Sequence, residues 1–318
     1  MRFLILILFT SCSLLNSVTE SLPKPEFTLK DIKIKDINLD SINLLVNTNL
    51  RNPYPVKLPK SILKTDIFLE SLKLTQITTD LGEIPSRETK DFPLDLKLSY
   101  KDLYNVITKF PTKELLALSY KGTVSVPVPD SYKSLRQAPF EIPVSGEKAI
   151  PAVLPNVEIQ NFKVDLPTAS SVMSAAGSQG LANTVMDSLQ NILGGNRSKK
   201  VNLDSLKSVD LNLDTNFDIS LKNQAAAKLL FQSLKYDLKL GGENFLSGEP
   251  SEILNKGTES IIKISGKLPI KSFSQSLISS FQQKSANFQL QGSSLLNVSN
   301  MDESNMPFQF NKSGNFKW

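Results

Sequence analysis

Apolar and polar residues alternate along most of this chain with a period of two. The clearest case runs from Val209 to Leu221, where apolar residues or Thr alternate with Asp, Asn and Ser. Alternation of this kind is typical of a strand with one buried face. Shorter examples occur at Ile42–Leu50, Phe92–Leu98 and Leu118–Val126, and Pro, Gly and Asn separate them. The pattern therefore predicts a mainly β protein whose antiparallel sheets pack face to face as β-sandwiches.

Two short segments have helical spacing instead. One is Tyr100–Ile107, preceded by Ser99 as a candidate N-cap. The other lies in "SFSQSLISSF", where Ser272 and Gln275 form a candidate capping box next to apolar residues spaced by four. We expect each of these lone helices to close one end of a sandwich.

Four blocks of the first half of the chain recur in the same order in the second half. In these blocks Gly122 falls on Gly292, and Asp66 falls on Asp237. The paired blocks are PEFTLKDIKI with PNVEIQNFKV, LPKSILKTDIFL with LLFQSLKYDLKL, LSYKGTVSV with FQLQGSSLL, and PFEIPVSGE with PFQFNKSGN. Similarity that repeats in order indicates a tandem duplication.

The duplication predicts two tandem sandwich domains of the immunoglobulin or fibronectin type, 25–150 and 151–318, each with one short helix. The second domain also has a helical insertion at about 167–200 that the first lacks. Apolar residues at helical spacing make this insertion a candidate apolar arm: Val185, Met186, Leu189, Ile192 and Leu193. Such an arm would lie on a membrane or cover an apolar groove. Because its polar face lacks Lys and Arg, the favoured alternative is a helix that caps the second sandwich.

The start of the chain predicts an export signal. Arg2 precedes the apolar run Phe3–Phe9, which is about 12 Å long as a helix and therefore too short to span a bilayer. Small polar residues and then Cys12, the only cysteine, follow this run. The order resembles a bacterial lipobox in the looser form familiar in spirochaetes, and an ordinary signal peptide is the alternative.

The lipobox resemblance implies a lipoprotein signal peptide at 1–11, a lipid on Cys12 and a tether linker at 12–24. A flexible linker of this length reaches about 20 Å, so the folded domains would stay near a bilayer. We therefore expect an exported, membrane-anchored lipoprotein at the periplasmic face or the outer membrane of a diderm bacterium. Its expected partners are the membrane, through the lipid, and lipids or envelope proteins.

The residue composition excludes most catalytic chemistry. The chain has no histidine and a single cysteine, which leaves no internal disulfide, no histidine-dependent triad and no classical zinc site. The acidic run from Asp210 has Thr215 and Leu221 where a calcium loop needs Gly and Glu. We expect no metal, no cofactor and no catalytic residue. An enzyme that uses Asp, Glu, Ser or Lys alone is the alternative.

The charge pattern does not indicate a nucleic-acid partner. The net charge of +5 comes from 36 basic and 31 acidic residues that are mixed along the chain. The densest basic run, at 196–200, has no aromatic residue that would stack on a base. We therefore expect no nucleic acid and only a weak attraction to an anionic membrane surface.

The first domain also resembles a known family. The features are an Asn-Pro turn at Asn52 and Pro53, the helix in "LSYKDLYNVI" and the closing segments "YKGTVSV" and "FEIPVSG". Together they resemble the water stress and hypersensitive response (WHy) domain of late embryogenesis abundant type 2 proteins, over 25–150. In the second copy Asn223 falls on Asn52, but Gln224 replaces the proline. The turn also has a purely structural interpretation, because Asn bonds nearby backbone and Pro ends a strand.

The family resemblance implies an antiparallel sandwich with one helix, no known catalytic residue, and an association with desiccation and stress tolerance. We therefore expect a non-enzymatic, lipid-anchored protein of the cell envelope that acts as a binding or protective module in water or envelope stress. The alternative is a protein that binds or bridges lipid or another hydrophobic ligand inside its sandwiches. The oligomeric state stays open.

Overall fold

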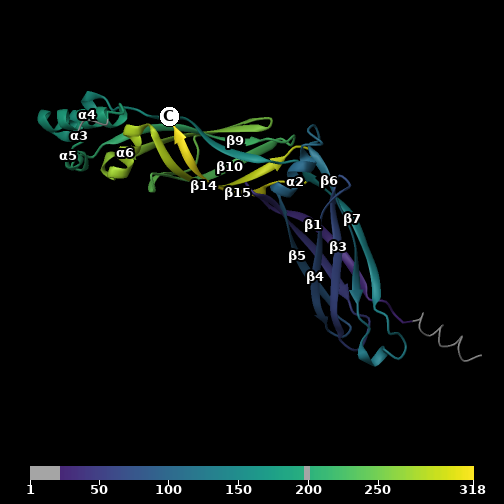
Figure 1. Ribbon diagram of the computed structural model, residues 1–318. Helices are drawn as coiled ribbons and strands as arrows, with labels where there is room; N and C mark the ends of the chain where they lie inside the picture. Colours follow the sequence, from purple (N-terminus) through teal and green to yellow (C-terminus); the bar gives the residue numbers. More distant parts are fainter. Residues whose placement is uncertain (1–21, 197–200) are drawn as a thin grey trace, which may run out of the picture. The chain divides into compact units, whose positions relative to one another are not determined.

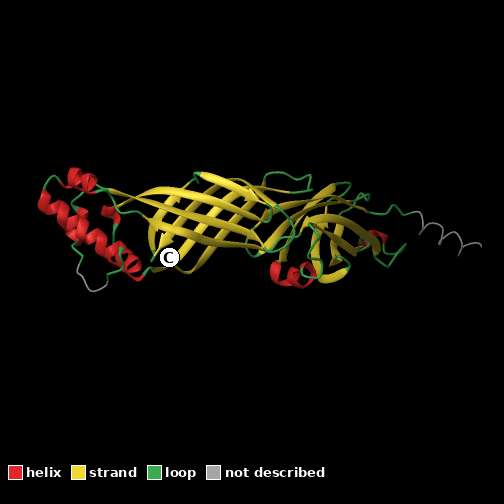
Figure 2. Cartoon of the chain, turned by 90° about the horizontal axis from the view of Figure 1, so that it is seen from above, coloured by secondary structure: helices red, strands yellow, loops and turns green. Residues whose placement is uncertain are grey.

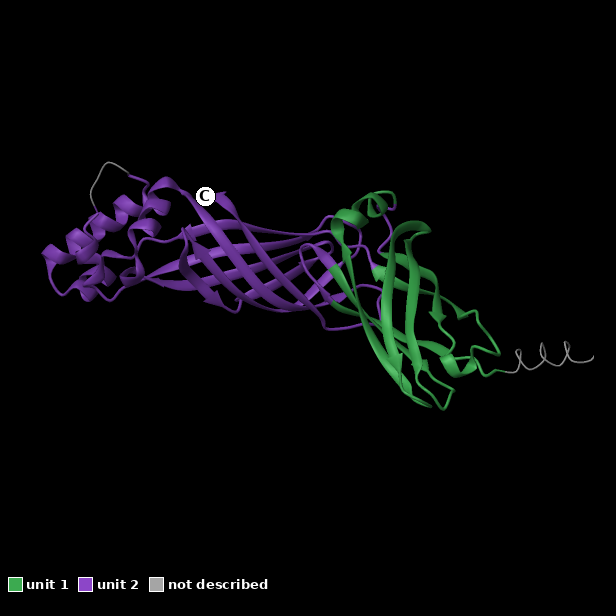
Figure 3. Cartoon of the chain, turned by 60° about the horizontal axis from the view of Figure 1, so that its bottom comes forward, with its two compact units in different colours: residues 1–35, 42–109, 115–150 green, residues 36–41, 110–114, 151–318 purple. Residues whose placement is uncertain are grey.

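The computed structural model describes residues 22–196 and 201–318 (Figure 1). The predicted signal peptide, Cys12 and most of the predicted linker lie outside the described residues. Strands make up most of the regular structure (Figure 2), so the prediction of a mainly β chain is confirmed. The chain forms two compact units, which we call the first and the second unit (Figure 3). The first unit comprises the described residues up to 35 with 42–109 and 115–150, and the second comprises 36–41, 110–114 and 151–318.

Strands of two sheets form the first unit. One sheet has the order β4-β3-β6-β7, and β1, β2 and β5 are neighbours in the other. Helix α2 connects β5 to β6. The elements are β1 (Glu26–Ile37), β2 (Ser41–Arg51), β3 (Leu58–Leu69), β4 (Leu72–Ile84), β5 (Thr89–Ser99), α2 (Tyr100–Ile107), β6 (Leu115–Val126), the 3-10 turn η1 (Asp130–Tyr132) and β7 (Phe140–Pro151).

The second unit repeats this strand order. Its sheets are β11-β10-β14-β15 and β12-β13-β9-β8, so β8, β9 and β13 correspond to β1, β2 and β5. Ile37, which is counted with this unit, pairs in parallel with Phe308 of β15. The elements are β8 (Pro155–Val164), α3 (Ala169–Ala176), α4 (Gln179–Leu193), α5 (Leu203–Lys207), β9 (Asn212–Asn223), β10 (Leu229–Leu240), β11 (Glu243–Gly248), β12 (Glu252–Lys256), β13 (Glu259–Pro269), η2 (Ile270–Ser272), α6 (Gln275–Gln283), β14 (Ser285–Val298) and β15 (Met306–Lys317).

Gly122 of β6 and Gly292 of β14 take the same place against the neighbouring strand. A Cβ atom on Gly122 would overlap the carbonyl oxygen of Lys64 in β3. A Cβ atom on Gly292 would lie 2.9 Å from the carbonyl oxygen of Lys235 in β10. Lys64 and Lys235 are themselves equivalent in the aligned blocks. Both units therefore have glycine at the same close approach of two backbones, where a Cβ atom would be crowded.

The helix caps differ from the prediction in one place. Ser99 caps α2 as the sequence predicts. The predicted cap of α6, Ser272, is wrong, because the hydroxyl of Ser274 accepts the hydrogen bond from the Leu277 N–H at 3.1 Å. Ser272 instead ends the 3-10 turn η2, and its hydroxyl donates to the carbonyl of Pro269 at 2.6 Å. The extra turn delays the start of the helix by two residues.

The last residues of the predicted linker contact the first unit. Leu22 packs against the buried apolar cluster that includes Leu50 and Phe140. The hydroxyl of Tyr54 donates to the carbonyl of Pro23 at 2.6 Å. These contacts order the chain directly ahead of β1.

Candidate functional site

An apolar cavity of about 250 Å³ lies between the two sheets of the first unit, and all seven of its strands contribute to the wall. Leu63 and Leu118, on the central strands β3 and β6, are buried. Ile77, Leu94 and Val144, on edge strands, keep part of their surface accessible. The cavity is therefore closed at its centre and more open toward the sheet edges.

Few polar groups line this cavity. The hydroxyl of Thr65, a residue only 8% exposed, has no hydrogen-bonding partner among the described residues. The hydroxyl of Thr48 donates to a backbone carbonyl at 2.9 Å. The carboxylate of Asp95 is paired with the ammonium group of Lys35 at 2.9 Å. Thr65 thus leaves one buried hydroxyl unsatisfied on a largely apolar wall.

The size of the cavity sets what it holds. At about 30 Å³ for each water-sized group, it accommodates roughly eight methylene groups. A largely apolar wall whose one fully buried unsatisfied hydroxyl is that of Thr65 matches a short alkyl chain that carries one polar group. The arrangement can bind such a chain but offers it no charged partner.

Asn52 holds the turn between β2 and β3. Its side chain is buried, with the residue 1% exposed. The side-chain carbonyl accepts from the Tyr54 N–H at 2.8 Å, and the amide group donates to the carbonyls of Val56 and Pro85, each at 2.8 Å. Pro53, which follows directly, has no N–H that needs a partner. One side chain therefore joins two loops through their backbone groups.

Asn223 makes the corresponding contacts in the second unit, and the residue is 2% exposed. It accepts from the N–H of Ala225 at 3.1 Å and donates to the carbonyl of Ala227 at 2.7 Å, two and four residues onward as at the first turn. Gln224 stands where the first unit has Pro53, and its N–H donates to the carbonyl of Leu154 at 3.0 Å. The second turn thus supplies a partner for the N–H that proline lacks.

The candidate apolar arm packs inside the second unit. Val185, Leu189 and Ile192 of α4 are completely buried, whereas Met186 and Leu193 are partly accessible. The helices in contact with α4 are α3, α5 and α6. Contacts within the unit therefore occupy most of the apolar face of α4. Of the helices in the described ranges, none is both long and apolar enough to cross a membrane.

Several acidic side chains in the described ranges lie in surface ion pairs, such as Asp91 with Lys30. No three His, Cys, Asp or Glu residues within 22–196 and 201–318 form a group that could hold a metal ion. The hydrogen bond from Lys73 holds the pKa of Asp66 below its ordinary value, and the two groups lie 2.7 Å apart. Because this pair is partly exposed to water, the shift reflects surface pairing and not a group tuned for catalysis.

Comparison with known proteins gives one sequence relative of interest. No family model matches the chain. The desiccation protectant protein Lea14 homolog of Glycine max is 27% identical over 154 residues, which is 48% of this chain and 89% of that protein. The similarity supports a domain of the late embryogenesis abundant type 2 kind in about half of the chain.

Two solved structures are also similar to this chain. A solution structure of a protein from Arabidopsis thaliana is 20% identical, with a TM-score of 0.33, and the match covers 41% of this chain and 83% of that one. A putative late embryogenesis abundant protein, also solved in solution, is 18% identical, with a TM-score of 0.34. That match covers 44% of this chain and 79% of the other.

Proposed function

We propose that this protein is a non-enzymatic stress protein that protects other cell components during water loss. The observation that carries the proposal is the sequence similarity to a desiccation protectant protein. The folded surfaces of the two units act as the protective or binding element. The proposal assigns the function to the faces of the sheets and not to a catalytic centre.

We also propose that the two units are tandem copies of one WHy-like sandwich, 25–150 and 151–318, each closed by one helix. The shared strand order supports this arrangement. The matched contacts of Asn52 and Asn223 support it further, because both side chains bond the backbone two and four residues onward. The second copy differs by its helical insertion.

A lipid on Cys12 is the proposed attachment to the cell envelope, at the periplasmic face or the outer membrane of a diderm bacterium. The order of apolar run, small residues and cysteine supports it. Radiolabelled palmitate supplied to cells expressing the wild type or Cys12→Ala tests the attachment. We expect label on a membrane-bound wild type and none on the variant. An unlabelled or freely soluble wild type would contradict the proposal.

Drying experiments test the protective function. A desiccation-sensitive enzyme such as lactate dehydrogenase is dried with the purified chain and rehydrated, and its remaining activity is measured. An equal mass of an inert globular protein serves as the control. We expect more activity to survive with this chain, and equal survival would sink the proposal.

Binding of a hydrophobic ligand is a second candidate function, and the cavity of the first unit favours it. At about 0.8 kcal/mol for each buried methylene group, eight such groups contribute roughly 6 kcal/mol. The unsatisfied Thr65 hydroxyl offers the ligand a hydrogen bond. A short fatty alcohol combines these two features, because its head group is a single uncharged hydroxyl.

Native mass spectrometry with 1-decanol as the probe tests this second function. We expect a one-to-one adduct with the wild type. Leu94→Trp, which fills the cavity, removes the adduct, whereas Leu166→Trp at a position 48% exposed keeps it. No adduct on the wild type, or equal adducts on both variants, would exclude the cavity as the site.

A further inference from the structure

Three residues that line the cavity of the first unit have aromatic counterparts in the second unit. The pairs are Ile32 with Phe162, Val46 with Phe217, and Thr65 with Tyr236. The first and third pairs come from the aligned blocks. In the second pair, each residue lies six positions before the buried asparagine of its own unit. The pairs therefore stand on corresponding strands, which are β1 and β8, β2 and β9, and β3 and β10.

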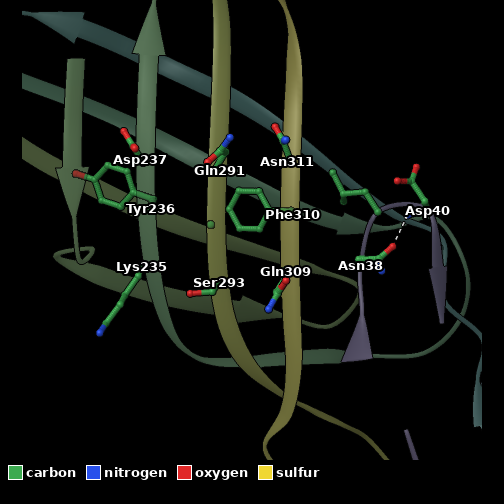
Figure 4. A pocket seen from close by; sticks show the side chains of 12 residues that line it. Asn38, Asp40, Lys235, Tyr236, Asp237, Gln291, Ser293, Gln309, Phe310 and Asn311 are labelled. Carbon is green, nitrogen blue, oxygen red and sulfur yellow. Dashed lines mark hydrogen bonds between the residues drawn. The ribbon is translucent and has the colours of Figure 1, made fainter. Parts of the chain in front are cut away.

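In the second unit these aromatic rings pack against each other between the two sheets. The ring centroids of Phe162 and Phe217 lie 6.1 Å apart. Those of Phe217 and Tyr236 also lie 6.1 Å apart, in an edge-to-face arrangement. Figure 4 shows the ring of Tyr236 on β10, between Lys235 and Asp237. All three aromatic residues are buried. The second unit therefore fills with rings the place that is hollow in the first.

The equivalent positions of the first unit leave space. Val46 lies on β2, which has a neighbouring strand on each side, and yet part of its surface stays accessible, as does part of Ile32. Thr65 is buried, but its hydroxyl has no partner among the described residues. Empty space in a protein interior lowers stability, because interiors are normally close-packed. Since the second unit shows that this fold can fill the space, the cavity is a property of the first unit's sequence.

Two positions of the cavity wall differ in the opposite direction. Phe27 and Tyr120 are larger than their counterparts in the aligned blocks, Val157 and Leu290. Phe27 lies on β1, and the side chain of Tyr120 reaches β7, because a Cβ atom on Gly146 would lie 2.1 Å from the tyrosine hydroxyl oxygen. The first unit thus has its large rings toward β1 and β7 and small side chains between them. This distribution encloses a hollow in place of a packed core.

We propose that the first unit alone holds an alkyl chain with an uncharged head group, and that the small side chains of Ile32, Val46 and Thr65 determine this binding. The second unit, whose rings occupy the equivalent space, holds none. The inference rests on the second candidate function, the binding of a hydrophobic ligand, and adds which unit binds and which residues decide it. Thr65 acts twice, because its small size makes room for the chain and its hydroxyl bonds the head group.

Native mass spectrometry of the full chain over a series of 1-decanol concentrations tests the proposal. The triple variant Ile32→Phe/Val46→Phe/Thr65→Tyr gives the first unit the residues of the second. We expect a one-to-one adduct with the wild type. The triple variant should bind at least about tenfold more weakly, because the rings displace several methylene groups of the ligand. Tyr236→Phe, which keeps the ring in the second unit, is the matched control and should bind like the wild type.

Circular dichroism checks that the triple variant is folded. If the three rings together prevent folding, Thr65→Tyr alone takes its place in the test. This single substitution puts a ring where the second unit has one, and it should also weaken the adduct.

The outcomes separate the inference from the function on which it rests. No adduct with the wild type would refute hydrophobic ligand binding itself. Full binding by the folded triple variant, or by folded Thr65→Tyr where the triple variant does not fold, would leave ligand binding standing and overturn the inference. Two adducts on the wild type, or loss of the adduct in Tyr236→Phe, would overturn it as well, because the second unit would then take part in binding.

Discussion

Replacing Asn52 or Asn223 by Ala removes a buried amide that bonds the backbone of two loops. Asn52→Ala leaves the N–H of Tyr54 and the carbonyls of Val56 and Pro85 without this partner. Asn223→Ala does the same to a matching set of backbone groups in the second unit. Because the contacts correspond, the two substitutions should have similar effects on the free energy of unfolding.

The magnitude follows from how many of these groups water can reach. A buried group that loses its partner costs about 1–3 kcal/mol. Tyr54 is buried, whereas Val56 is partly exposed and Pro85 is exposed, so water replaces some of the lost bonds. One or two groups thus carry the full cost, which gives roughly 2–4 kcal/mol for each substitution. With a urea dependence near 2 kcal/mol per M, the midpoint falls by about 1–2 M.

Urea unfolding followed by two signals measures these effects. Trp318 is the only tryptophan, and its ring lies 5.7 Å from that of Phe281 in the second unit, so its fluorescence reports on that unit. Circular dichroism reports on both units. We expect Asn223→Ala to shift the fluorescence transition and Asn52→Ala to shift only the dichroism. Asn311→Ala, at an exposed position, is the control and should change stability by less than about 0.5 kcal/mol.

A change below about 0.5 kcal/mol in either asparagine variant would refute the reasoning, because a surface substitution does as little. It would mean that the buried amide contributes nothing beyond what water supplies. A fluorescence transition that moves as far in Asn52→Ala as in Asn223→Ala would show instead that the two turns do not act within separate units.

Three further predictions concern single residues. Thr65→Val and Thr215→Val each remove a buried hydroxyl that has no partner in the described chain. Each should therefore raise the free energy of unfolding by about 1 kcal/mol and raise the thermal midpoint. A lower midpoint would show that the hydroxyl is bonded. Gly122→Ala should cost about 1–3 kcal/mol in urea unfolding, since its Cβ overlaps backbone. Gly180→Ala in α4 has open space around the added Cβ, so it should raise the free energy of unfolding by about 0.5–1 kcal/mol. Equal effects of Gly122→Ala and Gly180→Ala would contradict the close packing at Gly122. Burial raises the pKa of Tyr236 in the folded protein. Its contribution to stability should therefore be fully present below the ordinary pKa of about 10 and be lost as the pH rises through the pKa of the folded state. An alkaline urea series on wild type and Tyr236→Phe checks this, and identical pH dependence of the two would contradict it.

The clearly alternating strands, and the correspondence between strands of the two units, were predictable from the sequence. Alternation from Val209 to Leu221 reveals a strand because one face of β9 is buried, although the strand itself begins at Asn212. The aligned blocks also identified equivalent strands, since Gly122 and Gly292 occupy the same place in their sheets. Local patterns succeed where burial of one face determines the residue types.

Features that depend on tertiary contacts were not predictable in this way. The Asn-Pro turn was visible locally, but the bond from Asn52 to Pro85 joins residues 33 positions apart. The cap of α6 moved to Ser274 because a 3-10 turn preceded the helix. The cavity depends on how far side chains fill the space between two sheets and on which strands lie side by side. Alternation shows which side of a strand faces inward, but it does not show how far apart the sheets lie or which strands are neighbours.

Protection during drying is the central claim, and leakage from dried vesicles tests it most directly. Vesicles loaded with a self-quenching dye are dried and rehydrated with the wild type, with Asn52→Ala/Asn223→Ala, or with an equal mass of an inert protein. The account predicts the least leakage with the wild type, because its folded surfaces protect the vesicles. It predicts more leakage with the destabilised double variant, under conditions where circular dichroism shows that variant to be unfolded. Equal leakage with the wild type and the inert protein would contradict the account.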